Sequence, residues 1–148
     1  MRTCIILIIV LFTTSLVVVA GETKTLPTNE YVKFSVALKE KSLKAGRAGN
    51  LLIRLQPKKG IHINLKPAIS MAFDTTGMNV HAGTPTIPKA DTFLNISKPI
   101  QQPFTLDKNV KTGTVVLKGS VTYYYCSDAD GWCSRFKQPF EIPVNITR

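Results

Sequence analysis

Apolar and polar side chains alternate with a period of two along residues 115–125 of this chain of 148 residues. Successive side chains of a β-strand point to opposite faces of the sheet, so this alternation is typical of a strand with one buried face. The predicted buried face carries Val115, Leu117, Gly119, Val121, Tyr123 and Tyr125. The opposite face carries Val116, Lys118, Ser120, Thr122 and Tyr124.

The same alternation recurs along residues 32–39, 51–56, 61–66 and 140–147, with turn residues between the segments. No segment after the first twenty residues has a helical period. Several short strands separated by turns predict an all-β domain built as a sandwich of antiparallel strands. Pro99 and Pro103 are compatible with an edge strand or a loop, but not with a central strand. The predicted core includes Phe34, Val36, Ile53, Leu117, Val121, Ile142 and Val144.

The first twenty residues have the pattern of an export signal. A short positive start at Arg2 precedes a largely apolar run, and Val18-Val19-Ala20 offers small residues for cleavage before Gly21. The alternative is a transmembrane anchor, but the run is short and interrupted. The predicted organisation is a signal peptide at 1–20, a lead-in segment at 21–30 and one domain at 31–148. We expect a periplasmic or secreted protein after cleavage.

The chain is basic, with a formal charge of +10 that falls to +9 without Arg2. The lysines are scattered and do not alternate with aromatic residues, so the sequence lacks the pattern of a nucleic-acid-binding surface. A basic, solvated surface favours acidic partners. We expect a monomer that binds no nucleic acid.

Cleavage before Gly21 would also remove Cys4, which leaves Cys126 and Cys133 as a pair. In an oxidising compartment two cysteines this close indicate a disulfide, or a thiol pair that is kept reduced for a purpose. Two hypotheses remain open at this point. The bond is either a structural clip on a surface loop, or a redox pair in a short exposed loop that undergoes thiol–disulfide exchange.

The segment from Tyr125-Cys126 through Asp128 and Gly131-Trp132-Cys133, leading into Phe140-Glu141-Ile142-Pro143-Val144, resembles a known family. It is similar to the N-terminal periplasmic domain of the thiol:disulfide interchange protein DsbD. Two weaker similarities lie at Gly60-Ile61-His62-Ile63-Asn64 and at Asp91-Thr92-Phe93-Leu94. The resemblance implies an immunoglobulin-like fold over residues 31–148.

The resemblance also implies roles for individual residues. Cys133 would form the mixed disulfide with partner proteins, and Cys126 would resolve it. Phe93 would cap the pair, and Asp91 would lie near the thiols and accept a proton. Tyr125, Asp128 and Trp132 would be the neighbours of the cysteines.

The chain departs from the family in two respects. The cysteine loop is one residue longer than the usual spacing. The larger family protein also carries a membrane-embedded domain and a thioredoxin-like domain, neither of which occurs in this sequence. We therefore expect electrons to come from a separate thioredoxin-like protein or membrane electron carrier and to pass to oxidised periplasmic proteins. The sequence leaves open whether the domain is itself an enzyme, a protein-disulfide reductase.

Other residues that could bind a metal or take part in chemistry are interpreted here without such a role. His62, Met71, Met78 and His81 are soft ligands for a metal such as copper, but their spacing matches no metal-binding motif. His62 is expected to face solvent or to lie at a loop mouth. Asp128 and Asp130 are expected to be turn residues. No metal and no cofactor are expected.

Overall fold

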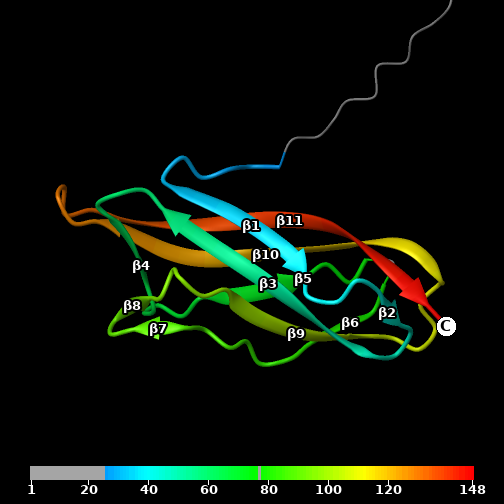
Figure 1. The fold of residues 1–148 in the computed structure, drawn as a ribbon. Helices are drawn as coiled ribbons and strands as arrows, with labels where there is room; N and C mark the ends of the chain where they lie inside the picture. The colour runs from blue at the N-terminus through cyan, green and yellow to red at the C-terminus, as the bar shows by residue number, and fades with distance from the viewer. Residues whose placement is uncertain (1–25, 77) are drawn as a thin grey trace, which may run out of the picture.

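The computed structural model describes residues 26–76 and 78–148, and over these residues the chain is all-β, without a helix. The strands that form the two sheets are β1 (Val32–Leu38), β2 (Leu43–Lys44), β3 (Ala48–Pro57), β4 (Ile61–Asn64), β5 (Ser70–Phe73), β6 (Val80–Ala82), β7 (Lys89–Ala90), β8 (Phe93–Leu94), β9 (Ile100–Leu106), β10 (Gly113–Ser127) and β11 (Cys133–Thr147). The predicted all-β class is confirmed, and the two longest strands are those that form the C-terminal hairpin (Figure 1).

The strands form a four-stranded sheet, in the order β1-β3-β9-β6, and a seven-stranded sheet. The larger sheet has the order β2-β11-β10-β4-β8-β7, and β5 also pairs with β10. Every pairing of named strands is antiparallel except that of β2 with β11, which is parallel. The turn of the β10–β11 hairpin lies at one end of the molecule, and the C-terminus lies at the other (Figure 1).

Side chains from both sheets contribute to one buried cluster. Leu51, Ile53 and Phe104 come from the smaller sheet, whereas Leu117 and Tyr123 come from β10. Burial of this apolar surface is the main favourable contribution to folding. Of the predicted core residues, five are buried: Ile53, Leu117, Val121, Ile142 and Val144.

Phe34 and Val36 differ from the prediction because they are only half-buried against the cluster. They lie on β1, which is an edge strand of the four-stranded sheet. A side chain on an edge strand has a neighbouring strand on one side only, so less of its surface is covered.

Pro103 corrects another expectation, because it lies within β9, between β3 and β6. Proline cannot donate a hydrogen bond to a ladder. Its carbonyl oxygen accepts a hydrogen bond from the amide of Gly83, immediately after β6 ends at Ala82. The nitrogen of Pro103 therefore points to a position beyond the end of β6, so the lack of an N–H removes little hydrogen bonding from the ladder.

The predicted signal peptide at 1–20 and its cleavage site lie outside the described residues. The described end of the lead-in is attached to the larger sheet. Gln138 donates a hydrogen bond to the carbonyl oxygen of Pro27 at 2.9 Å, and Asn29 donates one to the hydroxyl of Tyr123 at 3.2 Å. In the part of the chain that the structure describes, no helix is long and apolar enough to span a membrane.

Candidate functional site

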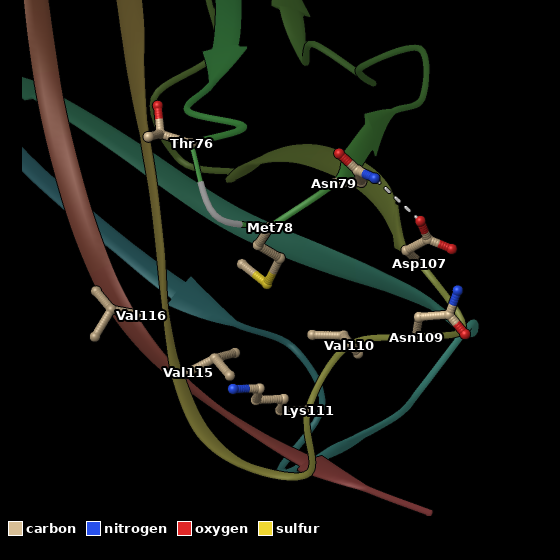
Figure 2. Close-up of a pocket in the computed structure, with 9 residues that line it drawn as sticks. All are labelled: Thr76, Met78, Asn79, Asp107, Asn109, Val110, Lys111, Val115 and Val116. Atoms are coloured by element: carbon tan, nitrogen blue, oxygen red, sulfur yellow. Dashed lines mark hydrogen bonds between the residues drawn. The ribbon is translucent and has the colours of Figure 1, made fainter.

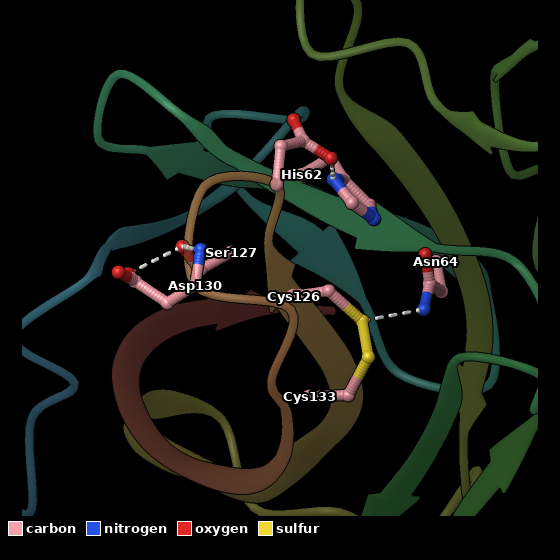
Figure 3. Close-up of a disulfide and its surroundings, with 7 residues drawn as sticks. His62, Asn64, Cys126, Ser127, Asp130 and Cys133 are labelled. Atoms are coloured by element: carbon pink, nitrogen blue, oxygen red, sulfur yellow. Dashed lines mark hydrogen bonds and ion pairs between the residues drawn. A yellow bond between two sulfur atoms is a disulfide. The ribbon is translucent and has the colours of Figure 1, made fainter.

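Cys126 and Cys133 form a disulfide at the turn end of the β10–β11 hairpin (Figure 3). The two residues are directly opposite each other in the register, and their Cα atoms are 4.0 Å apart. Next to them, the amide of Ser127 donates to the carbonyl oxygen of Trp132 at 2.9 Å. Opposite pairs alternate between hydrogen-bonded and non-hydrogen-bonded positions, so the cysteines occupy the closer, non-hydrogen-bonded type.

The turn beyond the disulfide is ordered by its own polar groups. The Ser127 hydroxyl donates to Oδ2 of Asp130 at 2.7 Å and accepts a hydrogen bond from the Asp130 amide at 3.2 Å. Gly131 has φ of 66°, a left-handed conformation that glycine adopts without a steric penalty. The prediction that Asp130 is a turn residue is confirmed.

The two cysteines differ in exposure. Cys126 is 5% exposed, whereas Cys133 is an exposed residue on β11. The expectation of an exposed loop that carries both sulfurs is therefore wrong for Cys126, because both cysteines belong to paired strands and β4 covers the far side of Cys126. Cys133 is therefore the more exposed residue of the pair.

Strand β4 places two polar side chains on the same face as the disulfide. His62 is opposite Cys126 and Asn64 is opposite Tyr124, so alternation directs His62 and Asn64 to one face. The Asn64 amide nitrogen Nδ2 donates a hydrogen bond to Sγ of Cys126 at 3.0 Å (Figure 3). Sequence analysis missed this contact. The alternation of residues 61–64 shows that both side chains share a face, but not which strand lies beside them.

His62 lies between the turn and the predicted cap. Its Nδ1 lies 2.8 Å from Oδ1 of Asp128, and the contact is an ion pair when the imidazole is protonated. Its ring centroid lies 4.2 Å from that of Phe93. Only 20% of the His62 side chain is exposed because the Phe93 ring packs against it, so the solvent-facing alternative is wrong. The contact with Asp128 places His62 beside the turn, in agreement with the other alternative, a position at a loop mouth. Asp128 is thus more than a turn residue.

The predicted cap segment forms the outer part of the same sheet. Phe93 lies on β8, is opposite Asn64 in the register and is 39% exposed. Asp91 lies in the tight turn between β7 and β8, with φ of 56°. Phe93 thus contacts the residue opposite Cys126, and the predicted roles of Phe93 as a cap and of Asp91 as a proton acceptor stay predictions.

A groove of about 680 Å³ begins beside Asn64 and runs along this edge of the sheet. Apolar side chains and two lysines form most of its wall. The lining residues are Asn64, Leu65, Lys66, Ala68, Ile69, Ile87, Lys89, Asp91, Thr92 and Phe93. The groove gives the face that carries the disulfide a concave, partly cationic border.

The opposite face of the hairpin end is aromatic. Trp132 contacts Tyr31 and Tyr125 edge-on, with ring centroids 5.1 and 5.7 Å apart. Tyr123 lies behind them, 6.1 Å from Tyr125, and its burial raises the pKa of its hydroxyl to about 12. Edge-on aromatic pairs add to the stabilisation from burial. Tyr125 and Trp132 are therefore neighbours of the cysteines in sequence, but they lie on the other face of the hairpin.

A second hollow, of about 470 Å³, lies at the far end of β10 (Figure 2). It is lined by Thr76, Met78, Asn79, Asp107, Asn109, Val110, Lys111, Val115 and Val116. Asn79 donates a hydrogen bond to Asp107 at 3.1 Å on its rim. His62 and His81, which were considered as metal ligands, lie in different sheets. Among the described residues, no three side chains from His, Cys, Asp and Glu gather at a possible metal site.

Comparison with known protein families and with curated proteins gives no match for the chain. Among solved structures, a crystal structure of the yeast GGA1 GAE domain is similar, with 13% sequence identity and a TM-score of 0.42. The similarity covers 78% of this chain and 96% of that domain. At this TM-score it carries no argument about function.

Proposed function

We propose that the chain is an exported thiol–disulfide interchange module with an immunoglobulin-like antiparallel β-sandwich fold. It passes electrons through Cys126 and Cys133, from a thioredoxin-like protein or a membrane electron carrier to oxidised periplasmic proteins. The observation that carries the proposal is the unequal exposure of the two cysteines across one strand pair. An exposed cysteine beside a buried one suits a pair in which one cysteine meets partners and the other resolves the intermediate.

The exchange proceeds in two steps. A thiolate of the donor attacks Sγ of Cys133, a donor–Cys133 disulfide forms, the bond to Cys126 breaks, and Cys126 leaves as a thiolate with the electron pair. The second thiol of the donor then attacks the donor sulfur in the mixed disulfide, and Cys133 is released in its reduced form. Delivery to an acceptor runs in the reverse sense, since Cys133 attacks the acceptor disulfide and Cys126 resolves the intermediate.

The decisive experiment uses Cys126→Ser and Cys133→Ser with a thioredoxin-like partner that lacks its own resolving cysteine. The remaining partner thiol is activated as a mixed disulfide with thionitrobenzoate. We expect Cys126→Ser to form a covalent complex on a non-reducing gel, because Cys133 displaces thionitrobenzoate and no resolving thiol remains. We expect Cys133→Ser to form none. Equal trapping by both variants would contradict the assignment of roles.

A structural clip is the second candidate, and the ordered turn favours it. Hydrogen bonds between Ser127 and Asp130 already fix the loop that the disulfide closes, so the bond completes a rigid hairpin end. In this case the domain is a redox-silent β-sandwich that binds a protein or envelope partner. The reduction potential separates the candidates, since structural disulfides have potentials below about −300 mV. A reduction potential below about −300 mV, together with no trapping by either serine variant, would favour the structural clip.

Export is tested separately. We expect the mature protein, purified from its native source, to begin at or near Gly21, because residues 18–20 fit a cleavage site. Intact-mass measurement gives the result directly. Retention of Met1 or Cys4 in the mature protein would contradict export by this signal.

A further inference from the structure

Asn64 is the polar side chain that the structure directs at the buried sulfur. It lies at the end of β4, opposite Tyr124 on one side and Phe93 on the other. Its Nδ2 lies 3.0 Å from Sγ of Cys126 (Figure 3). A disulfide sulfur has lone pairs and no hydrogen, so the amide must be the donor in this contact.

The contact gains importance when the disulfide opens. Cys126 is 5% exposed, so a thiolate there has little access to water. Burial disfavours the charged form of a thiol, and a hydrogen bond to the charged form favours it. Hydrogen bonds to charged groups are also stronger than those between neutral groups. The Asn64 amide therefore donates a weak hydrogen bond to the disulfide and a stronger one to the thiolate.

Other charged groups near this face are already paired or are more exposed. Asp128 lies against His62 Nδ1, and the Asp130 carboxylate accepts a hydrogen bond from the Ser127 hydroxyl. Arg135, opposite Tyr124 on β11, is exposed. Within the described chain, Asn64 is the side chain whose hydrogen bond reaches the sulfur of Cys126.

We propose that Asn64 is a catalytic residue that stabilises the departing Cys126 thiolate, so that partner thiols attack Cys133. The inference rests on the proposed function and adds the group that controls the leaving sulfur. Exchange is faster when the leaving thiolate is more stable. When a thiolate attacks Cys133, the electron pair of the broken bond moves to Cys126 Sγ, and the hydrogen bond from Asn64 strengthens as that charge develops.

The test measures reduction of the disulfide by glutathione and therefore needs no protein partner. We expect Asn64→Ala to slow the attack on Cys133 about tenfold, in line with the loss of a hydrogen bond to a charged group. Asn64→Asp, which has nearly the same shape, should be slower still because its carboxylate repels the thiolate. Asn109→Asp makes the same charge change in an exposed loop at the far end of β10 and should react at the parent rate.

The sign of the change separates this role from a covering or structural one. If Asn64 only covered the sulfur or held β4 in place, its removal would loosen the site and glutathione would react faster. A faster or unchanged rate in both Asn64 variants, with parent-like circular dichroism, would overturn the proposal. The equilibrium with glutathione gives a second measurement: a tenfold shift toward the disulfide in Asn64→Ala corresponds to a potential about 30 mV lower.

The glutathione experiment and the partner-trapping experiment fail independently. Slow reduction of Asn64→Ala combined with no trapping of any thioredoxin-like partner would leave the role of Asn64 standing and defeat the interchange function. Trapping by Cys126→Ser, combined with faster reduction of Asn64→Ala by glutathione, would support the interchange function and defeat the role of Asn64.

Discussion

The two faces of the β10–β11 hairpin end differ in composition although they share the same two strands. The inner face carries Tyr123, Tyr125 and Trp132, which pack on one another and on Tyr31. The outer face carries Cys126 and Cys133, with His62 and Asn64 beside them. The inner face is rich in buried aromatic surface, whereas the outer face carries the disulfide and two polar side chains.

This difference suits the proposed function, in which one face of the strand pair stabilises the hairpin and the other carries the disulfide. Aromatic packing stabilises the hairpin independently of the disulfide, because burial of large rings contributes several kcal/mol. If the proposed exchange takes place, this packing is expected to keep the strands paired while the disulfide on the outer face is open. A disulfide whose reduction unfolded the hairpin would be unsuited to repeated exchange.

The largest expected effect comes from the inner face. Tyr123 is fully buried, so Tyr123→Ala should lower the free energy of unfolding by about 3–5 kcal/mol, as for other large aromatic-to-alanine changes in cores. Urea denaturation with the disulfide intact measures the change. Tyr123→Phe keeps the ring and loses only the hydroxyl that accepts from Asn29, so it should cost about 1 kcal/mol. Similar losses in both variants would show that the hydroxyl outweighs the packing.

Removal of the disulfide should cost less. The ring closed by Cys126 and Cys133 is short, so the double variant Cys126→Ser/Cys133→Ser should lose about 2–3 kcal/mol in the chain-entropy model. If the inner face holds the hairpin, amide hydrogens of β10 near Tyr123 should remain protected from exchange in this variant. Loss of that protection, with the rest of the domain folded, would contradict the division between the two faces.

Alkaline pH probes the inner face without a change in packing. Burial raises the pKa of the Tyr123 hydroxyl in the folded state to about 12, against 10.0 for an ordinary tyrosine. Between these values the unfolded chain loses this proton and the folded chain keeps it, so stability falls as pH rises and is unaffected below the lower value. The parent protein should lose stability more steeply than Tyr123→Phe across this range. Parallel curves of stability against pH for the two proteins would show that Tyr123 ionises as readily in the folded protein as in the unfolded chain.

The smallest effect on stability should come from the outer face. Phe93 is 39% exposed, so Phe93→Ala should cost under about 1 kcal/mol, as for other partly exposed positions. If Phe93 is a cap, small thiols should nevertheless reduce the disulfide faster in this variant. Ile96→Ala, a change at another exposed apolar residue, is the control and should react at the parent rate. Equal rates of reduction for the parent, Phe93→Ala and Ile96→Ala would show that Phe93 does not cap the disulfide.

The sequence predicted the strands well where one pattern covered many residues. The alternation in residues 115–125 identified β10, and the buried positions of Leu117, Val121 and Tyr123 agree with it. Gly119 interrupts the apolar series for a reason that only the structure shows. A Cβ atom there would lie 2.6 Å from both the carbonyl oxygen of Ala72 and the Cζ atom of Phe140.

The site was predicted less completely, because its parts meet across strands that are distant in sequence. The cysteines were visible as a local motif, but the contact between Asn64 and Cys126 joins residues 62 positions apart. Alternation indicates the face of a side chain and gives no information about the neighbouring strand. The small strands β7 and β8 were invisible for a different reason, since each has only two residues and no period can be read from two.

The orientation of the disulfide across its strands limits the direction from which a nucleophile can arrive. The bond links β10 to β11, and a thiolate attacks in line with the bond that it breaks. Behind Cys126 along that line lies β4, whereas on the far side of β11 the strand that pairs with it in the described chain, β2, reaches only Ile146 and Thr147. In the proposed exchange, a thiolate would therefore approach Cys133 from the side of β11 on which no described strand lies beside this residue, whereas β4 lies beside Cys126 on the opposite side.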